Sequence, residues 1–351
     1  MALECLYFGA KNEFFQRIES IVSSKAHALK SSEEHVKKSD VLYKGVLIVQ
    51  LDEIGQCNEF YSWLLERKQL SETYFDNSIV GLIVKSDSDY YTKKFSSTAL
   101  FLMNQLGARS LGHSVVEFID AYANLKMWQI AENLSREAVI ELMVQRLIDQ
   151  MTEYGTGAEE KEQQKPKILV LHAGTHEKSN TLALWRMVKE HIDYDNISEF
   201  HVEEGTAIDC YGCSFDTCTY YSLHKSCFYG GVITEELLPL IEESDVIVWI
   251  CPNYNDAISA KLTAVINRLT VLYRRVSFKD KKIYSLIVSA NSGSDSVASQ
   301  LIDALVINKG FQLPPRFALM ALASEEGSIY KVPGIEEKAK AFAEQIMDEC
   351  L

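Results

Sequence analysis

The chain has 351 residues, of which 47% are hydrophobic and 24% are charged, so it can bury the cores of two domains of ordinary size. Its net charge of −14 argues against a nucleic-acid surface, which needs clustered lysine and arginine. No stretch approaches the roughly 18 apolar residues of a membrane span, and the first residues lack the pattern of a secretory signal. We therefore expect a cytoplasmic protein with no membrane and no nucleic-acid partner.

Strands and helices alternate in the N-terminal half. Short apolar runs predict buried strands, and apolar residues spaced three to four apart predict helices. Strands are expected at residues 3–7, 45–51, 79–84 and 114–119, and helices at residues 14–22, 59–70, 100–106 and 138–151. Residues 23–40 carry no clear signal. This alternation predicts a mostly parallel sheet covered by helices on both faces.

Residues 153–166 are charged, contain glycine and proline, and have no apolar face, which is typical of a linker. We therefore predict one domain at residues 1–152 and a second at residues 167–351. The second half alternates more strictly than the first. Strands are expected at residues 168–172, 197–202, 246–251, 283–290 and 317–321, and helices at residues 182–191, 234–243, 259–273, 296–308 and 335–347. The pattern predicts an α/β fold with doubly wound parallel sheets, which bind ligands outside the carboxyl ends of the strands.

Three loops meet at that predicted edge, and the first follows residues 168–172. A helix that begins at the carboxyl end of a parallel strand attracts anions, because unpaired backbone N–H groups and the positive end of the helix dipole converge there. We interpret this loop as the site of a flavin mononucleotide (FMN) phosphate; an ordinary strand-loop-helix joint with a good cap is the alternative. The candidate residues are Gly174, Thr175, Lys178, Ser179, Asn180 and Thr181.

The second loop begins with a Pro-x-Tyr turn after residues 246–251. Such a turn offers N–H groups to the edge of a heterocycle and an aromatic face to its plane. The third loop has small residues that let a ligand approach the backbone closely. The candidate residues are Pro252, Asn253, Tyr254 and Asn255 in the second loop, and Ala290, Asn291, Ser292 and Gly293 in the third. Alternatively, Pro252 only ends the strand, Tyr254 only packs, and the third loop is an ordinary turn.

Together the three loops resemble the NADPH-dependent FMN reductase and iron-sulfur flavoprotein group of flavodoxin-like proteins, over about residues 167–347. The resemblance rests on Gly174-Thr175 with Ser179-Asn180-Thr181, and on Pro252, Tyr254, Ser259, Ala260 and Leu262. It implies a flavodoxin-like fold, FMN as cofactor and NAD(P)H as co-substrate. Cys251 and Thr263 replace a serine and a lysine of the family pattern. His176-Glu177 stands where the family often has arginine, which leaves Lys178 as the only expected cation near the phosphate.

Four cysteines form a compact cluster with the spacing C-x2-C-x4-C-x8-C: Cys210, Cys213, Cys218 and Cys227. In a reducing compartment such a cluster suggests metal or redox chemistry more than structural disulfides. Iron-sulfur flavoproteins are similar in carrying a compact cysteine motif for a [4Fe–4S] cluster, although their usual spacing is tighter. A structural zinc and free or redox-active thiols are the alternatives.

These patterns predict an FMN-dependent NAD(P)H oxidoreductase that passes electrons to a small molecule or a redox protein. Motifs for hydrolytic or ATP-driven chemistry are absent, and the sequence singles out no catalytic acid or base. An electron-transfer flavoprotein without its own substrate and a non-catalytic flavodoxin-like scaffold are the alternatives. The N-terminal half resembles a degenerate flavodoxin-like copy without a flavin motif. Because FMN reductases commonly work as dimers, the resemblance implies a homodimer, or an intramolecular pseudo-dimer in which residues 86–94 shape the flavin site.

Overall fold

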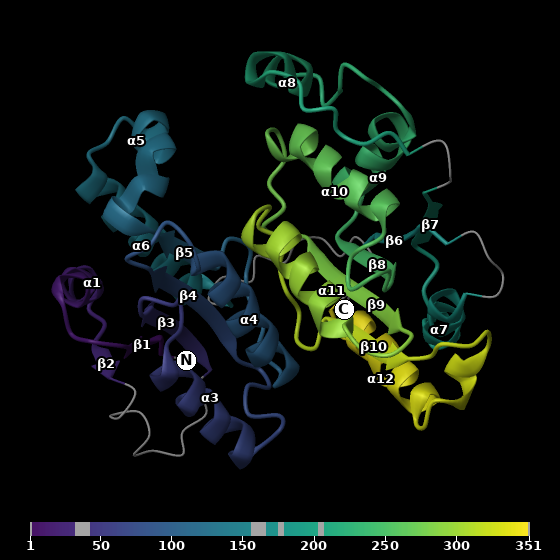
Figure 1. Ribbon diagram of the computed structural model, residues 1–351, viewed down its shortest axis with the longest axis horizontal. Helices are drawn as coiled ribbons and strands as arrows, with labels where there is room; N and C mark the ends of the chain where they lie inside the picture. The colour runs from purple at the N-terminus through teal and green to yellow at the C-terminus, as the bar shows by residue number, and fades with distance from the viewer. Residues whose placement is uncertain (1, 32–42, 156–165, 175–178, 203–206, 350–351) are drawn as a thin grey trace. The chain divides into compact units, whose positions relative to one another are not determined.

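The computed structural model describes residues 2–31, 43–155, 166–174, 179–202 and 207–349. The chain divides into two compact units, Met1–Lys161 with Pro314–Arg316, and Glu162–Leu313 with Phe317–Leu351. Each unit has its own five-stranded sheet (Figure 1). The linker predicted at residues 153–166 falls mostly on residues 156–165, which lie outside the described residues. The predicted domain limits therefore stay a prediction.

The sheet of the N-terminal unit is parallel throughout, with strand order β2-β1-β3-β4-β5. Its strands are β1 (Glu4–Phe8), β2 (Leu29–Ser31), β3 (Lys44–Gln50), β4 (Ile79–Lys85) and β5 (Val115–Phe118). Every residue of β3 and β4 is buried, as their continuous apolar runs predict for central parallel strands. The edge strand β2 lies within residues 23–40, where no strand or helix was predicted.

Helices cover both faces of this sheet. They are α1 (Glu13–Ser24), α3 (Asn58–Leu70), α4 (Thr92–Gln105), the 3₁₀ turn η1 (Asp120–Leu125), α5 (Lys126–Glu132) and α6 (Arg136–Glu153). Neighbouring residues of β1 point to opposite faces: Tyr7 meets Phe15 of α1 with ring centroids 4.8 Å apart, and Phe8 meets Phe60 of α3 at 5.4 Å. Helices α1 and α6 pack against each other over the Tyr7 face.

The C-terminal unit repeats the same topology. Its strands are β6 (Ile168–His172), β7 (Ile197–His201), β8 (Val246–Pro252), β9 (Lys282–Ser289) and β10 (Ala318–Leu322), all parallel in the order β10-β9-β8-β6-β7. Counted within each unit, both sheets have the order 2-1-3-4-5, which is the flavodoxin-like order. The predicted fold class, two doubly wound parallel sheets, is confirmed.

The helices of the C-terminal unit are α7 (Asn180–Lys189), α8 (Phe215–Ser222), η2 (Ile233–Leu237), α9 (Leu238–Glu243), α10 (Ala260–Tyr273), α11 (Ser294–Leu301), η3 (Ile302–Ile307), η4 (Ser328–Lys331) and α12 (Ile335–Asp348). Helices α7 and α12 pack together on one face of the sheet. The single helix predicted at residues 296–308 corresponds to α11, which continues into the π-helical segment η3. Helix α8 was not predicted. Among the described residues, none of the helices is both long enough and apolar enough to cross a bilayer.

Candidate functional site

The second and third predicted loops line one cavity of about 410 Å³ at the carboxyl edge of the C-terminal sheet. They come together there because β8 and β9 are neighbouring parallel strands that end at the same edge. The lining residues are Asn253, Tyr254, Asn255, Asp256, Ala290, Asn291 and Ser292. All of these except Asp256 are predicted site residues, while Pro252 is the last residue of β8 and Gly293 adjoins the cavity.

Asn253 connects the two loops. Its backbone N–H donates to Val288 O at 3.0 Å, and its side-chain Nδ2 donates to Ser289 Oγ and to Ser292 O, both at 2.9 Å. The side-chain Oδ1 is buried and has no hydrogen-bond partner within the described part of the chain. Since a buried acceptor without a donor is unfavourable, this atom favours a ligand that presents an N–H or O–H group in the cavity.

Gly293 is required by the shape of the third loop. Its φ of +87° is unfavourable for residues with a side chain, and a Cβ there would lie 1.8 Å from Asp256 Oδ1 and 3.0 Å from Asn253 Nδ2. A side chain at residue 293 would therefore displace the Asp256 carboxylate and crowd the Asn253 amide, in a backbone conformation that favours glycine.

Gln300 of α11 joins the second loop to the helix that follows the third. Its Nε2 donates to Asp256 O at 2.8 Å, and its Oε1 accepts from the Ile258 N–H at 3.2 Å. The sequence did not point to Gln300, because its two contacts cross more than 40 positions of the chain.

Tyr254 presents its ring to solvent at the edge of the cavity. The side chain is 58% exposed, while the backbone pairs with Ala257 in a small antiparallel bridge, with N···O distances of 3.3 and 3.2 Å. The ring is thus held from its backbone side and remains available for stacking. Cys251, which precedes this turn, is different: burial raises the pKa of its thiol to about 12, so it is a neutral, unreactive group.

The first loop lies between β6 and α7. Ser179 caps α7, its Oγ accepting from the Leu182 N–H at 3.4 Å, and Thr181 is buried in the first turn. Gly174 lies next to Leu182: a Cβ built at residue 174 would be 3.4 Å from Leu182 Cδ1. Two predicted residues of this loop, Thr175 and Lys178, lie outside the described residues, as do His176 and Glu177.

Asn180 contacts the segment that follows β10. Its Nδ2 donates to Ala323 O at 3.1 Å and to Glu325 O at 2.7 Å, and its Oδ1 accepts from the Ile329 N–H at 3.4 Å. Sequence reasoning assigned Asn180 to the phosphate. In the structure its side-chain amide holds the loop after β10 against the start of α7.

The comparison with protein families agrees with this geometry. Residues 166–324 match the family of NADPH-dependent FMN reductases. The matched residues contain all three loops, so the resemblance seen in the C-terminal half of the sequence is confirmed. The class of enzyme predicted there, an NAD(P)H-dependent oxidoreductase with FMN as cofactor, agrees with this family.

Several solved structures are similar to about half of the chain. An NAD(P)H:quinone oxidoreductase from Methanothermobacter marburgensis is 13% identical, with coverage of 52% of this chain and 98% of its own and a TM-score of 0.39. An FMN-dependent NADH-azoreductase from Bacillus anthracis, in complex with FMN, is 12% identical, with coverage of 51% of this chain and 99% of its own and a TM-score of 0.38. Among curated proteins, none matches the chain significantly.

Residues 166–324 include a further cation near the first loop, which the sequence analysis did not identify. Lys261, in the first turn of α10, lies with Nζ 3.4 Å from Ala173 O, the carbonyl just before Gly174. The available signal was a lysine directly after Ser259-Ala260, at the start of a helix that begins at the same sheet edge as the phosphate loop.

His172 and His201 form a stacked pair at the carboxyl ends of β6 and β7. Their ring centroids are 4.7 Å apart with the planes 7° from parallel, because the two residues are register partners in the sheet. Burial, and then the neighbouring His201, lower the pKa of His172, so the neutral form is favoured beside the first loop.

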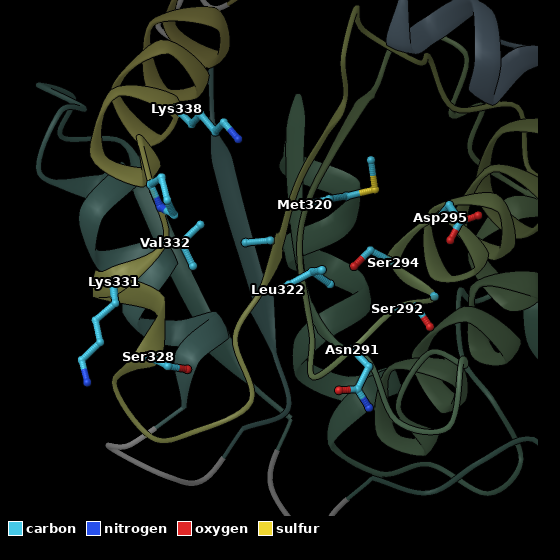
Figure 2. Close-up of a pocket in the computed structure, with 13 residues that line it drawn as sticks. Asn291, Ser292, Ser294, Asp295, Met320, Leu322, Ser328, Lys331, Val332 and Lys338 are labelled. Atoms are coloured by element: carbon cyan, nitrogen blue, oxygen red, sulfur yellow. The ribbon is translucent and has the colours of Figure 1, made fainter.

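A second, larger cavity of about 800 Å³ lies on the other side of the third loop (Figure 2). Asn291 and Ser292 line both cavities. The far side of the larger cavity comes from η4 and the start of α12, and includes Lys331 and Lys338. Met320 and Leu322 of β10 lie between these two sides.

The four clustered cysteines lie in and around α8. Cys210 is exposed, and Cys213, Cys218 and Cys227 are partly buried. Partial burial and the neighbouring Cys218 raise the pKa of Cys213, with smaller effects of Cys227 and Cys210. In the described part of the chain, no group of three or more histidine, cysteine or acidic side chains is arranged to hold a metal ion. The expected iron-sulfur cluster therefore finds no support in this geometry.

Arg268 contacts the last cysteine of the cluster. It is only 1% exposed, and its Nη1 donates to Cys227 Sγ at 2.9 Å, while its Nη2 donates to Gly230 O. The segment that carries the cysteines is thereby attached to α10, whose first turn places Lys261 beside Ala173 of the first loop.

Proposed function

We propose that the C-terminal unit binds FMN and that the protein is an FMN-dependent NAD(P)H oxidoreductase. The observation that carries this proposal is the cavity between the second and third loops, with the buried Asn253 Oδ1 in its wall. The edge of an isoalloxazine ring carries an N–H group, from which this oxygen would accept a hydrogen bond. The Tyr254 ring would stack on the plane of the isoalloxazine. When bound, FMN accepts a hydride and releases electrons singly or in pairs, chemistry that the side chains do not supply.

The phosphate of FMN is assigned to the start of α7. The positive end of the helix dipole favours a dianion there, and the Lys261 ammonium lies beside Ala173 at the same loop. Lys261 would thus supply a charge that the sequence attributed to Lys178 alone. The other candidate phosphate contacts remain predictions: Gly174, Thr175, Lys178, Ser179, Asn180 and Thr181.

We assign the larger cavity to the nicotinamide dinucleotide. It shares Asn291 and Ser292 with the candidate flavin cavity, so a ligand there lies next to the flavin across one loop. Lys331 and Lys338 line its far side, and the Lys338 side chain extends toward the cavity in Figure 2, so Lys338 provides a cation that suits a phosphate of NAD(P)H. The electron acceptor is a small molecule or a redox protein.

The test is a titration of anaerobically prepared protein with FMN, followed by NADPH. We expect a yellow one-to-one complex whose flavin absorbance is bleached by NADPH and restored by a quinone. Asn253→Leu should weaken FMN binding about tenfold or more, because it removes the oxygen and both inter-loop hydrogen bonds. Asn267→Leu is the matched control, since Asn267 donates instead to Asp209 at 2.9 Å.

Two results would contradict the proposal in different ways. A flavin complex that NADPH does not reduce, but that a reductase does, would indicate an electron carrier without its own substrate. Protein that takes up no FMN would leave a flavodoxin-like scaffold.

The four clustered cysteines are proposed to be thiols and not metal ligands. Cys213 and Cys218 are close enough for a side-chain hydrogen bond, and the described residues include no metal-binding group. Metal analysis of anaerobic protein should find well under one iron or zinc per chain. Iron at about four per chain, with a brown colour that chelation removes, would restore the [4Fe–4S] prediction.

A further inference from the structure

The N-terminal unit has a cavity of its own, for which neither the sequence nor the family match suggested a ligand. It measures about 780 Å³ and lies at the carboxyl edge of the N-terminal sheet. The first turns of α1 and α6, the ends of β3 and β4, and the segment after β5 all contribute to it. Doubly wound folds bind ligands at this edge.

Gln50, the last residue of β3, provides a buried acceptor in the cavity wall. The residue is only 8% exposed, and its Nε2 donates to Leu51 O and to Asp87 Oδ2, both at 3.2 Å. These two acceptors fix the orientation of the amide, because the oxygen could not replace the nitrogen at either contact. The remaining atom, Oε1, is buried and has no hydrogen-bond partner among the residues that the structure describes. A ligand with a donor group would satisfy it.

Three cations surround one aromatic ring in the same cavity. Around the ring centroid of Tyr122, Arg17 Cζ lies at 6.0 Å, Lys85 Nζ at 5.5 Å and Arg136 Cζ at 5.7 Å. All four residues line the cavity, and Lys85 is also paired with Asp87 at 2.6 Å. Arginine side chains bind phosphate through two parallel hydrogen bonds, so Arg17 and Arg136 form a site suited to a phosphate group.

Carboxylates and amides supply the rest of the polar lining. Glu137 is paired with Arg136 at 3.1 Å, while Glu13 and Asp120 are exposed residues in the first turns of α1 and η1. Carboxylate and amide oxygens accept hydrogen bonds from hydroxyl groups, and an aromatic ring packs against a sugar face. The lining thus has four carboxylates beside its three cations, so a ligand here needs several hydroxyl donors in addition to one phosphate.

We propose that this cavity binds a sugar phosphate, with the phosphate between Arg17 and Arg136, the sugar against Tyr122, and a hydroxyl donating to Gln50 Oε1. The proposal is independent of flavin binding in the C-terminal unit. The N-terminal unit, which lacks a flavin motif, would then bind a different kind of ligand.

The test is calorimetry on the full chain with ribose 5-phosphate, inorganic phosphate and ribose, each with and without saturating FMN. We expect ribose 5-phosphate to bind one-to-one in both conditions, and more tightly than inorganic phosphate or ribose. Arg17→Gln and Arg136→Gln should each weaken its binding about tenfold or more, since each removes a charged hydrogen bond. Arg146→Gln is the matched control, because Arg146 forms an exposed ion pair with Glu132 at 3.0 Å, outside the cavity.

Gln50→Met separates the sugar contact from the phosphate contact. It keeps the length of the side chain but removes its oxygen, so the preference for ribose 5-phosphate over inorganic phosphate should fall about tenfold in folded protein. The fold of each variant is checked by its thermal unfolding transition. Absence of ribose 5-phosphate binding, or binding that Arg17→Gln and Arg136→Gln leave within twofold of the wild type, would overturn the proposal, whatever FMN does.

Discussion

At the scale of single residues, the candidate flavin cavity depends on one position without a side chain. Gly293→Ala would place a methyl group 1.8 Å from Asp256 Oδ1 at a φ of +87°. We expect FMN binding to weaken at least tenfold and the free energy of unfolding to fall by about 2 kcal/mol or more, from backbone strain and forced loop movement. Flavin fluorescence titration and urea unfolding measure the two effects.

Gly212→Ala is the control for the backbone term alone. Gly212 has a φ of +67°, but nothing lies within 4 Å of a Cβ built there. Only the cost of a left-handed alanine remains, about 1 kcal/mol, and FMN binding should not change. Equal losses in the two variants would show that crowding at residue 293 is unimportant.

The stacked histidines predict a pH dependence of stability. Burial and His201 lower the pKa of His172 below its ordinary value of 6.5, so the unfolded chain binds more protons than the folded chain in this range. The contribution to stability is full above pH 6.5, and it is lost as the pH falls from 6.5 toward the folded pKa. Urea unfolding measured between pH 5 and pH 8 should show this slope.

His172→Gln should make that slope shallower, because it removes the group whose pKa is lowered in the folded chain. His191→Gln serves as the comparison, since His191 is exposed after the end of α7. If the two variants keep the same slope as the wild type, the histidine pair has no part in acid sensitivity.

At the scale of helices and strands, Lys261 joins the start of α10 to the end of β6. Lys261→Gln should weaken FMN binding about threefold to tenfold through loss of a charge near the phosphate, with little change in unfolding. Lys279→Gln, at an exposed lysine of the same unit, keeps the change in net charge the same and should have no effect. Riboflavin, which lacks the phosphate, should bind all three proteins equally. Sensitivity of riboflavin binding to Lys261→Gln would contradict a phosphate contact.

The central strands could be predicted within one or two residues because they are unbroken apolar runs. The edge strand β2 could not, since it has only three residues, Leu-Lys-Ser, and lacks a buried run. Helix α8 was hidden because its sequence, FDTCTYYS, has no apolar stripe and buries only Ser222.

The candidate site was predictable to the extent that it consists of loops after consecutive strands. Six of the seven residues that line the smaller cavity were predicted, because the alternation of strands and helices fixes which ends meet. The assignment of Asn180 to the phosphate stays a prediction, but sequence could not reveal its side-chain contacts with Ala323 and Glu325, which lie more than 140 positions away. The Lys261 contact and the cations around Tyr122 escaped prediction for the same reason.

At the scale of the whole molecule, two units share one strand order but differ in their cavities. The N-terminal unit surrounds its cavity with arginine, lysine and carboxylates, whereas the smaller cavity of the C-terminal unit has no cation among the described residues of its lining, which are three asparagines, two small residues, one tyrosine and one aspartate. One topology thus presents two different chemistries at its strand ends, as expected when function depends on loops and not on the fold.

The proposed pseudo-partner role of the N-terminal unit can be tested by deletion. If residues 86–94 shape the flavin site, a chain without residues 1–150 should bind FMN more weakly or lose NADPH oxidation. If light scattering shows that the full chain forms a homodimer, the partner subunit at the flavin site would be another copy of the chain. A stable, fully flavin-loaded and active remainder would rule out the pseudo-partner role.

The bridge made by Gln300 has a mechanical consequence. Because one side chain on α11 hydrogen-bonds to the backbone of the Pro-x-Tyr turn at both Asp256 and Ile258, and Gly293 is the N-cap of α11, we expect the two walls of the smaller cavity to move together. Opening by separation of those walls would break both hydrogen bonds together. Entry of a cofactor should therefore depend on rotation of the exposed Tyr254 ring, which leaves the bridge intact and occurs on the nanosecond scale of surface side chains.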